Sequence, residues 1–458
     1  MLQMELFEST YADQYDQEGF SFYTPRVGDV TFLNGLSEPV HRWFRLTPSY
    51  SPELVRFLIE DLGCAPQMML CDPFLGKGTT AIEAKKLGLR AKGIELNPLL
   101  KLASEYALTW EVEVSKFARH FREFEEQMGK TLASAKLLSL EETLQKFELT
   151  LPAIHNVFRW WKKDALKELL LIKSAVWNIR DERFKRLYWL AVCASALDCA
   201  NVHRNHPTIS FDDHHNRRIQ VWTDFRENVE ALMTDLKRLP PREQWGEVQV
   251  IQGDSTRLAE SAVEQIDRVI TSPPYPNRFS YVHTTRPQLF FMEVFSEAAQ
   301  SADLDCAAIG GTWGKATSIL YDGIVVPYPH LEEILSPMIG GLRPRSNLMC
   351  NYAVKYFTMM DEHIRSLKKV TSRKFRGAYV VGNSRLSEVE IFTDILLGKM
   401  FEANGFQVDR ILVLRKRGGR KKLYETAVCV SRRYRSFPSV TTPVNPIRQH
   451  YKKYSNAC

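Results

Sequence analysis

Apolar and polar positions follow two different rhythms along the chain, and their order predicts strands alternating with helices. Leu54, Val55, Leu58 and Leu62 recur at helical spacing after Ser51, a side chain suited to cap that helix. The segment QMMLCDPFLGKGTTAIEAKKLG then combines a short apolar run, a glycine-rich turn and a helix, and RAKGIELNP follows as a second strand. This order predicts a βαβ unit, the first part of a doubly wound α/β sheet.

Helical periodicity replaces the strand pattern between residues 105 and 245. We interpret the seven tryptophans of this stretch mainly as core residues: Trp110, Trp160, Trp161, Trp177, Trp189, Trp222 and Trp245. Strands resume with VQVIQGDS and DRVITSPPY, and residues 276–345, rich in Pro and Gly, predict a loop-rich lobe or a lid. The sheet is completed by a helix at 351–369, strand GAYVVGNS, a helix at 388–404, and strands FQVDRILVLRKR and ETAVCVSRR, joined through Gly418 and Gly419.

Composition is that of a globular protein rather than a disordered or fibrous one. Of the 458 residues, 44% are hydrophobic and 25% are charged, so a sizeable core is available. The chain begins with an acidic segment that has no apolar signal-peptide core, and no apolar run of about 18 residues follows, so we expect a cytoplasmic protein without a membrane anchor. Eight cysteines without a Cys-x-x-Cys pair indicate reduced thiols rather than a zinc site or a disulfide framework.

The formal net charge of +7 is unevenly distributed. Basic residues gather near the C-terminus: Arg415, Lys416, Arg417, Arg420, Lys421 and Lys422, then Arg432, Arg433 and Arg435, then Lys452 and Lys453. Such clustering suits a face that binds a polyanion, although a solvated charged surface is the commoner explanation when nothing else supports binding.

A second polar segment, HRNHPTISFDDHHNRR at 203–218, is rich in histidine and aspartate. A metal site there is the less favoured interpretation, because no cysteine joins the cluster. We expect instead a polar loop that contacts phosphates or bases through Arg204, Asn205, Arg217 and Arg218.

The glycine-rich turn CDPFLGKGTT lies where an open α/β sheet binds its ligand. Gly76 and Gly78 allow a sharp turn and a close approach to a ligand. A phosphate-binding P-loop is excluded, because its first glycine is replaced by Cys71 and the residue after Lys77 is not Ser or Thr.

Carboxylates at successive strand ends point to a nucleoside ligand instead. Asp72 and Glu95 end the first two strands, and their offset is about that of a ribose-binding carboxylate in a dinucleotide-type unit. Asp254 ends the third strand, where it is placed to accept from an adenine amino group or to cap the next helix. The alternative, that Glu95 and Asp254 are only turn and cap residues, stays open for each alone.

The turn after the next strand is rigid and rich in acceptors. Thr271 to Tyr275 read Thr-Ser-Pro-Pro-Tyr, and the two prolines remove two N–H donors and fix two φ angles. The carbonyls of such a turn suit an NH₂ group, and Tyr275 offers a flat face for stacking a base. Alone, this string is more often just a turn.

Together, CDPFLGKGTT, GIELNP and ITSPPY closely resemble the motifs of S-adenosylmethionine-dependent DNA amino-methyltransferases, which methylate cytosine N4 or adenine N6. The Thr-Ser-Pro-Pro-Tyr version is similar to the cytosine-N4 branch. HRWFRLTPSYSPELVRFLIEDLG, GAYVVGNS and RILVLRKR resemble further parts of the family, so that the resemblance covers roughly residues 41–104 and 246–435. It implies a Rossmann-like class I methyltransferase sheet, mostly parallel, with a C-terminal antiparallel hairpin and a large helical insertion.

Position by position, the resemblance implies S-adenosylmethionine as cofactor and assigns no metal. The cofactor would be lined by Asp72, Phe74, Gly76, Gly78 and Thr79, with Glu95 at its ribose and Asp254 near its adenine. Ser272, Pro273, Pro274 and Tyr275 would hold the target base. Lys77 stands where the family usually has Ser, so a contact there would come from the backbone.

The implied reaction is methyl transfer to N4 of a cytosine flipped out of double-stranded DNA. Ser272 Oγ and the Pro273 carbonyl would accept the two amino hydrogens and orient the nitrogen lone pair. Ring-carbon methylation needs a thiolate, typically in a Pro-Cys dipeptide, and the sequence has none. Two alternatives stay open: an adenine-N6 or RNA amino-methyltransferase, and a non-catalytic DNA-binding subunit on the same scaffold.

The expected organisation is an N-terminal arm at 1–40, a catalytic domain at 41–104 and 246–435, a helical insertion at 105–245, a lobe at 276–345 as a candidate DNA contact, and a basic tail at 436–458. A separately encoded restriction endonuclease is a candidate partner, and a cytoplasmic, nucleoid-associated location is expected. The sequence leaves the DNA target and the oligomeric state open.

Overall fold

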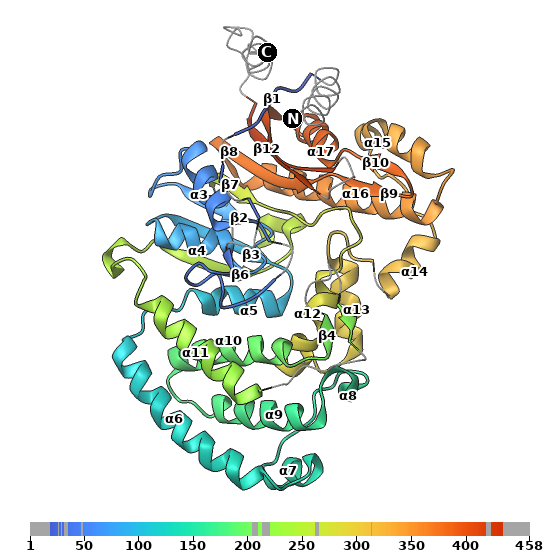
Figure 1. Ribbon diagram of the computed structural model, residues 1–458. Helices are drawn as coiled ribbons and strands as arrows, with labels where there is room; N and C mark the ends of the chain where they lie inside the picture. Colours follow the sequence, from blue (N-terminus) through green and yellow to red (C-terminus); the bar gives the residue numbers. More distant parts are fainter. Residues whose placement is uncertain are drawn as a thin grey trace, which may run out of the picture.

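An eight-stranded sheet forms the upper part of the molecule in Figure 1, and a layer of helices forms the lower part. The computed structural model describes residues 19–433, apart from 26, 29, 32–34, 47–48, 204–208, 213–219, 262–264, 313 and 418–422. In spatial order the strands are β1 (Phe22–Tyr23), β11 (Phe406–Arg417), β12 (Leu423–Arg432), β8 (Thr371–Gly382), β7 (Ile266–Thr271), β2 (Met69–Asp72), β3 (Arg90–Glu95) and β6 (Val248–Gln252).

Strand directions confirm the predicted α/β, Rossmann-like sheet, which is mostly parallel and ends in an antiparallel hairpin. From β6 to β8 every neighbouring pair is parallel, whereas β12 runs antiparallel to both β8 and β11. Strand β1 lies in the segment that was expected to be an arm, and it pairs parallel to β11. The Gly418–Gly419 turn and the tail 436–458 lie outside the described residues.

Helices cover both faces of the sheet because its central strands bury alternate side chains on opposite sides. In β8, Ala378 and Val380 face a cluster with α3 (Pro52–Asp61) and α4 (Thr79–Lys86). Tyr379 and Val381 face the other cluster, with α16 (Asn347–Val370) and α17 (Thr393–Ala403). Burial on both faces explains why these strands are continuous apolar runs.

Local signals place the helices that precede and follow the glycine-rich turn. Ser51 caps α3 as predicted, because its side chain accepts from Leu54 N at 3.0 Å and Pro52 occupies the first helical turn. Gly78 adopts a φ of 91° at the start of α4, a conformation that L side chains rarely adopt.

The helical character predicted for residues 105–245 is confirmed, and the resulting lobe recruits helices from outside that range. It contains α6 (Val114–Ala135), α7 (Leu140–Lys146), α8 (Val157–Trp160), α9 (Lys163–Trp177), α10 (Glu182–Asp198) and α11 (Val221–Leu236), with the short strands β4 (Val202–His203) and β5 (Ser210–Phe211). Its aromatic core includes Tyr188 packed on Phe124. Phe290 and Phe291 of α12 (Tyr281–Phe291) join the same core, as does α5 (Pro98–Ala107), so the sheet and the lobe are packed together.

The prediction that residues 276–345 are loop-rich is wrong. The segment forms α12, α13 (Ala298–Ala307), α14 (Lys315–Tyr321) and α15 (Pro329–Leu342). Pro329 lies in the first turn of α15, where a proline is tolerated, and Pro337 lies inside the helix. Leu331 and Leu335 of α15 are fully buried, and this burial outweighs the poor local propensity.

The helix predicted to begin at residue 388 begins later. Residues Val389–Ile391 form β10, which pairs antiparallel with β9 (Ser384–Leu386). Ser387 and Glu388 between them both have positive φ, as a two-residue hairpin turn of this kind requires. Two short 3₁₀ helices, η1 (Arg242–Gln244) and η2 (Ser255–Ser261), complete the elements.

Within the described ranges, none of the helices has both the length and the apolar character that a bilayer crossing requires.

Candidate active site

A pocket lies at the carboxyl ends of the central parallel strands, where open α/β sheets bind ligands. It encloses about 900 Å³, part of it open to solvent. Its wall includes Phe74, Gly76 and Thr79 after β2, Glu95 and Asn97 after β3, Asp254 after β6, Ser272 and Pro274 after β7, and residues of α12 and α13. Most of the site residues predicted from the sequence therefore meet at one cavity.

The glycine-rich turn is held against the end of the neighbouring strand. Gly76 has a φ of 56°, and its N–H donates to Glu95 Oε2 at 2.7 Å. A Cβ added at Gly78 would come within 3.0 Å of Ser104 Cβ, so glycine is also needed there for helix packing. Gly78 shapes the turn without lining the pocket.

Glu95 lies on the pocket wall with both of its carboxylate oxygens hydrogen-bonded to the backbone. Its second oxygen, Oε1, accepts from Asn97 N at 2.8 Å. Burial raises the pKa of Glu95 to about 7, although the N–H groups of Asn97 and Gly76 favour the charged form. Each carboxylate oxygen has a further lone pair, so Glu95 can still accept hydrogen bonds from two ligand hydroxyls.

Asp72 points into the protein rather than into the pocket. Its carboxylate accepts from Thr271 Oγ1 at 2.6 Å, from Tyr50 OH at 3.0 Å and from Phe74 N at 3.1 Å. Burial is the main cause that raises the pKa of Asp72. The residue expected to line the cofactor thus ties the ends of β2 and β7 together, since its strand-end carboxylate turns inward.

Asp254 caps the next helix, which is one of the two roles that the sequence left open. Its Oδ1 accepts from Thr256 N and from Thr256 Oγ1, both at 2.8 Å, which caps the following 3₁₀ helix η2. The residue also lines the pocket.

Several pocket residues were not singled out by the sequence. Ser49 and Tyr50 line it from the segment before α3, and Asn97 and Tyr281 line it from α5 and α12. Ser49 and Tyr50 lie in HRWFRLTPSYSPELVRFLIEDLG, a segment that the resemblance covers, so that likeness was the available signal for them. Nothing in the local sequence of Tyr281 predicts its place in the pocket.

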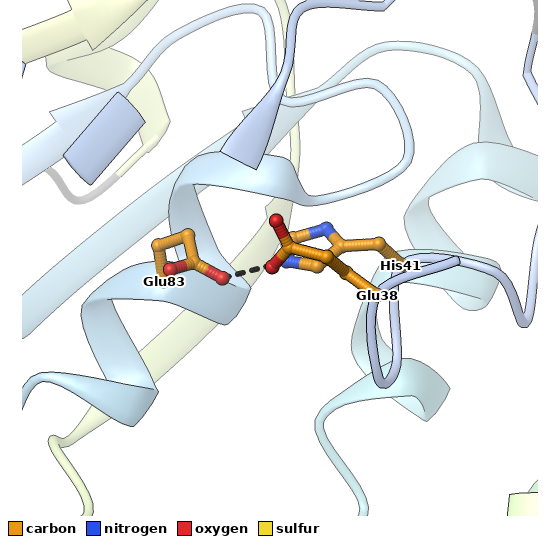
Figure 2. Close-up of side chains that lie close together, drawn as sticks. All are labelled: Glu38, His41 and Glu83. Carbon is orange, nitrogen blue, oxygen red and sulfur yellow. Dashed lines mark hydrogen bonds and ion pairs between the residues drawn. The ribbon is translucent and has the colours of Figure 1, made fainter. Parts of the chain in front are cut away.

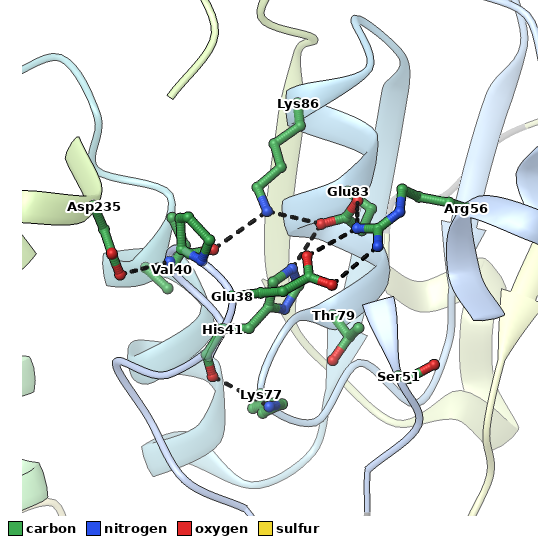
Figure 3. A network of polar contacts seen from close by, with 12 residues as sticks. Glu38, Val40, His41, Ser51, Arg56, Lys77, Thr79, Glu83, Lys86 and Asp235 are labelled. Atoms are coloured by element: carbon green, nitrogen blue, oxygen red, sulfur yellow. Dashed lines mark hydrogen bonds and ion pairs between the residues drawn. The ribbon is translucent and has the colours of Figure 1, made fainter. Parts of the chain in front are cut away.

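Lys77 joins the glycine-rich turn to the chain before α3. Its buried ammonium donates to the His41 carbonyl at 3.2 Å, and burial lowers the pKa of Lys77 to about 8. Beside it, Glu38, His41 and Glu83 place potential metal-ligand atoms within 4.8 Å of one another (Figure 2). Arg56 donates to both carboxylates (Figure 3).

Arg56 and Lys86 therefore supply the positive charge that balances the carboxylates of this cluster. Lys86 Nζ also donates to Glu83 Oε1 at 2.9 Å. Burial favours the neutral form of Glu83, but the hydrogen bond from His41 and, after it, the charge of Lys86 lower the pKa of Glu83 to about 2. Burial lowers the pKa of His41 to about 4, so its ring is neutral at pH 7. We interpret the cluster as a clamp that fixes residues 38–41 on α4.

The Ser-Pro-Pro-Tyr turn presents two of its four residues to the pocket. Ser272 and Pro274 are on the wall, and the Pro274 carbonyl accepts from Tyr356 OH at 2.7 Å. Pro273 is buried. The Tyr275 ring lies outside the wall: its OH donates to Glu425 Oε1 at 2.7 Å, and the Arg417 guanidinium lies 5.0 Å from the ring centre.

Only part of each predicted basic or polar loop is described. Arg415 donates to Glu425 Oε2, and Arg417 Nη1 donates to the Asn383 carbonyl at 3.4 Å. The neighbouring Arg420, Lys421 and Lys422, and also Arg204, Asn205, Arg217 and Arg218, lie outside the described residues. Arg415 and Arg417 therefore pack against the site rather than forming an isolated charged surface.

Comparison with known proteins points to methyl transfer. No protein-family model matches the chain. It is 23% identical over 424 residues to the type II methyltransferase M.BsoBI of Geobacillus stearothermophilus, covering 85% of this chain and 83% of that protein. It is 21% identical to the type II methyltransferase M.MvaI of Kocuria varians, covering 86% and 88%.

Among solved structures, the rRNA methyltransferase AviRa of Streptomyces viridochromogenes aligns with 86% of this chain and 92% of its own, at 11% identity and a TM-score of 0.28. That score is too low to support an argument about this chain. The sheet order, the pocket and the sequence relatives together support a methyltransferase, and they imply a methyl donor of the S-adenosylmethionine type.

Proposed function

We propose that this protein is a DNA methyltransferase that transfers a methyl group from S-adenosylmethionine to N4 of a cytosine extruded from duplex DNA. The observation that carries the proposal is that Glu95 and Gly76 line the same cavity as Ser272 and Pro274. A nucleoside site and an acceptor-rich turn therefore share one space. The sequence likeness to two type II methyltransferases supports the same reaction class.

The cofactor half of the pocket fits a sulfonium nucleoside. Glu95 would accept from the ribose hydroxyls, Asp254 lies on the wall for the adenine amino group, and Phe74 supplies an apolar ring. His363 packs against Phe74 with ring centres 4.8 Å apart, which holds that ring in place. When bound, the cofactor supplies a methyl group activated by a positively charged sulfur.

The other half fits an amino group. An exocyclic amino nitrogen is a poor nucleophile, because its lone pair is delocalised into the ring. We assign the two amino hydrogens to the Oγ of Ser272, a residue of the pocket wall, and to the carbonyl of the next residue, Pro273. The Pro274 carbonyl accepts from Tyr356. Accepting both hydrogens favours a pyramidal nitrogen whose lone pair is aimed at the methyl group, so orientation and electrostatics carry the rate.

A base reaches this turn only after leaving the helical stack, at a cost of a few kcal/mol. Duplex DNA is the substrate we assign, with residues 41–104 and 246–435 as the catalytic part and 276–345 as a DNA contact. Arg415 and Arg417 place positive charge beside the turn. We include in the proposal a separately encoded restriction endonuclease as partner and a cytoplasmic location with the DNA.

The test is incubation of the purified protein with labelled S-adenosylmethionine and mixed-sequence duplex DNA, followed by mass analysis of the nucleosides and mapping of the modified sites. We expect N4-methylcytosine within one short sequence. N6-methyladenine would reassign the base, and labelling of RNA in preference to DNA would reassign the polymer. Cofactor binding without transfer to any nucleic acid would overturn the enzymatic assignment and favour a DNA-binding subunit.

A further inference from the structure

A chain of hydrogen bonds leads from Ser272, on the pocket wall, to the C-terminal hairpin. Ser272 Oγ lies 3.4 Å from Tyr275 OH, and Tyr275 OH lies 2.7 Å from Glu425 Oε1. Glu425 is on β12, 150 residues from Tyr275, and its side chain is 8% exposed. Its other oxygen accepts from Arg415.

The direction of these bonds follows from the chemistry of the groups. The carboxylate of Glu425, paired with the Arg415 guanidinium, accepts, and the Tyr275 hydroxyl donates. Burial raises the pKa of Tyr275 well above its usual value, so its hydroxyl keeps the proton it donates. With that single hydrogen committed to Glu425, the Tyr275 oxygen can only accept, and Ser272 must be the donor.

A consequence follows for the pocket. The Ser272 hydrogen points back toward Tyr275, which leaves the lone pairs of Ser272 Oγ available to an amino group. The opposite orientation would aim a hydroxyl hydrogen at the N–H groups of the base. One negative charge on a distant strand thus selects whether Ser272 accepts or donates.

The residues packed around Tyr275 hold its ring in place, and with it this chain of hydrogen bonds. A Cβ added at Gly382 would lie 2.7 Å from Tyr275 Cδ2 and 1.9 Å from Arg417 Nη1, so the ring and the guanidinium together fill the space that glycine leaves. Arg417 lies over the ring, which favours a guanidinium–aromatic contact. Arg415 balances the charge of Glu425.

We propose that Glu425 is a positioning residue of the methyl-transfer site, which acts through Tyr275 to hold Ser272 as a hydrogen-bond acceptor for the target amino group. This inference rests on the proposed function and adds to it a residue outside every motif. In this proposal Glu425 does not touch the substrate. It determines whether Ser272, which does, donates or accepts a hydrogen bond.

The variant that tests the direction of these hydrogen bonds is Glu425→Gln. It keeps the size and shape of the side chain but introduces an NH₂ group that can donate to Tyr275 and so reverse the direction of both bonds. We expect kcat to fall about tenfold, as for loss of a hydrogen bond to a charged group, while the cofactor Kd and the KM for DNA stay within about twofold. Glu390→Gln, at an exposed position of β10, is the matched control and keeps full activity.

The decisive measurement is a double-mutant cycle on a duplex that carries the sequence methylated by the wild type. Tyr275→Phe breaks the chain while keeping the ring, so adding Glu425→Gln to Tyr275→Phe, or to Ser272→Ala, is expected to cause no further loss of kcat. Losses that multiply would show that Glu425 acts on stability or elsewhere, and would overturn the inference.

Thermal unfolding and cofactor calorimetry of each variant distinguish a loss of folding from a change in the direction of the hydrogen bonds. If Glu425→Gln does not fold, the pair Tyr275→Phe and Ser272→Ala still tests the chain, because their kcat losses must overlap rather than multiply. An active wild type with multiplicative losses overturns this inference alone. A wild type that binds cofactor yet methylates no nucleic acid overturns the proposed function as well.

Discussion

The two halves of the pocket are held together in different ways. In the cofactor half, the bonds join near neighbours: Gly76 and Glu95 are 19 residues apart, and Glu95 and Asn97 are two apart. In the base half, Pro274 is held by Tyr356 from 82 residues away, and Tyr275 by Glu425 from 150 residues away. The glycine-rich turn and Glu95 therefore belong to one βαβ unit, to which Asp254 and the His363 ring packed on Phe74 are added from outside it. The base half has no such local unit and depends on the C-terminal hairpin and α16.

This difference separates binding from turnover. Changes near Glu95 should alter affinity for the methyl donor, and changes around the turn should alter kcat. Asp72 bonds to both Phe74 N in the first half and Thr271 in the second, so it is where the two halves are joined.

The largest effect is expected at that junction. Asp72→Ala leaves the donors of Thr271, Tyr50 and Phe74 without their buried acceptor, which costs about 3 kcal/mol of unfolding free energy and impairs both cofactor Kd and kcat. Denaturant unfolding and calorimetry measure the two. Asp72→Asn keeps an acceptor oxygen and should lose much less. Normal cofactor affinity in folded Asp72→Ala would show that the halves are independent.

Ser272→Ala tests the base half alone. Removing the acceptor on the wall should lower kcat about 100-fold, the order seen when one preorganised hydrogen-bonding group is lost from an active site. The cofactor Kd should not change, because Glu95 and the glycine-rich turn are untouched. Ser134→Ala, at an exposed position of α6, is the control. Unchanged single-turnover rates in Ser272→Ala would remove Ser272 from the reaction.

Glu95 gives the cofactor half its own pH dependence. The pKa of Glu95 is raised to about 7, so the carboxylate that accepts ribose hydroxyls forms only as the pH rises through 7. Cofactor affinity should therefore increase from pH 6 to pH 8. Glu95→Gln should weaken binding about tenfold at pH 8 and flatten this profile. Titration calorimetry checks both, and a wild-type affinity independent of pH over this range contradicts the role of Glu95.

The smallest effect is expected at the back of the turn. Tyr356→Phe removes the donor to the Pro274 carbonyl, and a single neutral hydrogen bond contributes about 1 kcal/mol, so kcat should fall about fivefold with cofactor Kd unchanged. Tyr321→Phe, at an exposed position, is the control. A change in cofactor Kd for Tyr356→Phe would contradict the claim that the base half affects turnover without affecting cofactor binding.

Sequence reasoning succeeded where the signal is local. The strand 406–417 was predicted to the residue, and Ser51 was recognised as a cap, because alternation and capping need only neighbouring positions. It failed for 276–345, where the prolines suggested loops but burial of Leu331 and Leu335 makes a helix. It also missed the bonds from Tyr50 and Thr271, which lie in other segments and turn the Asp72 carboxylate inward.

By itself, the sequence determined the βαβ unit, the glycine-rich turn with Glu95, and the rigid Ser-Pro-Pro-Tyr turn, because each is written in a short run of residues. The tertiary structure alone decided which side chains those turns meet. Glu425, Tyr356 and Gly382 reach the turn through strand pairing and helix packing. Such contacts arise from burying two faces of one sheet, and the spacing between residues 275 and 425 carries no local trace of them.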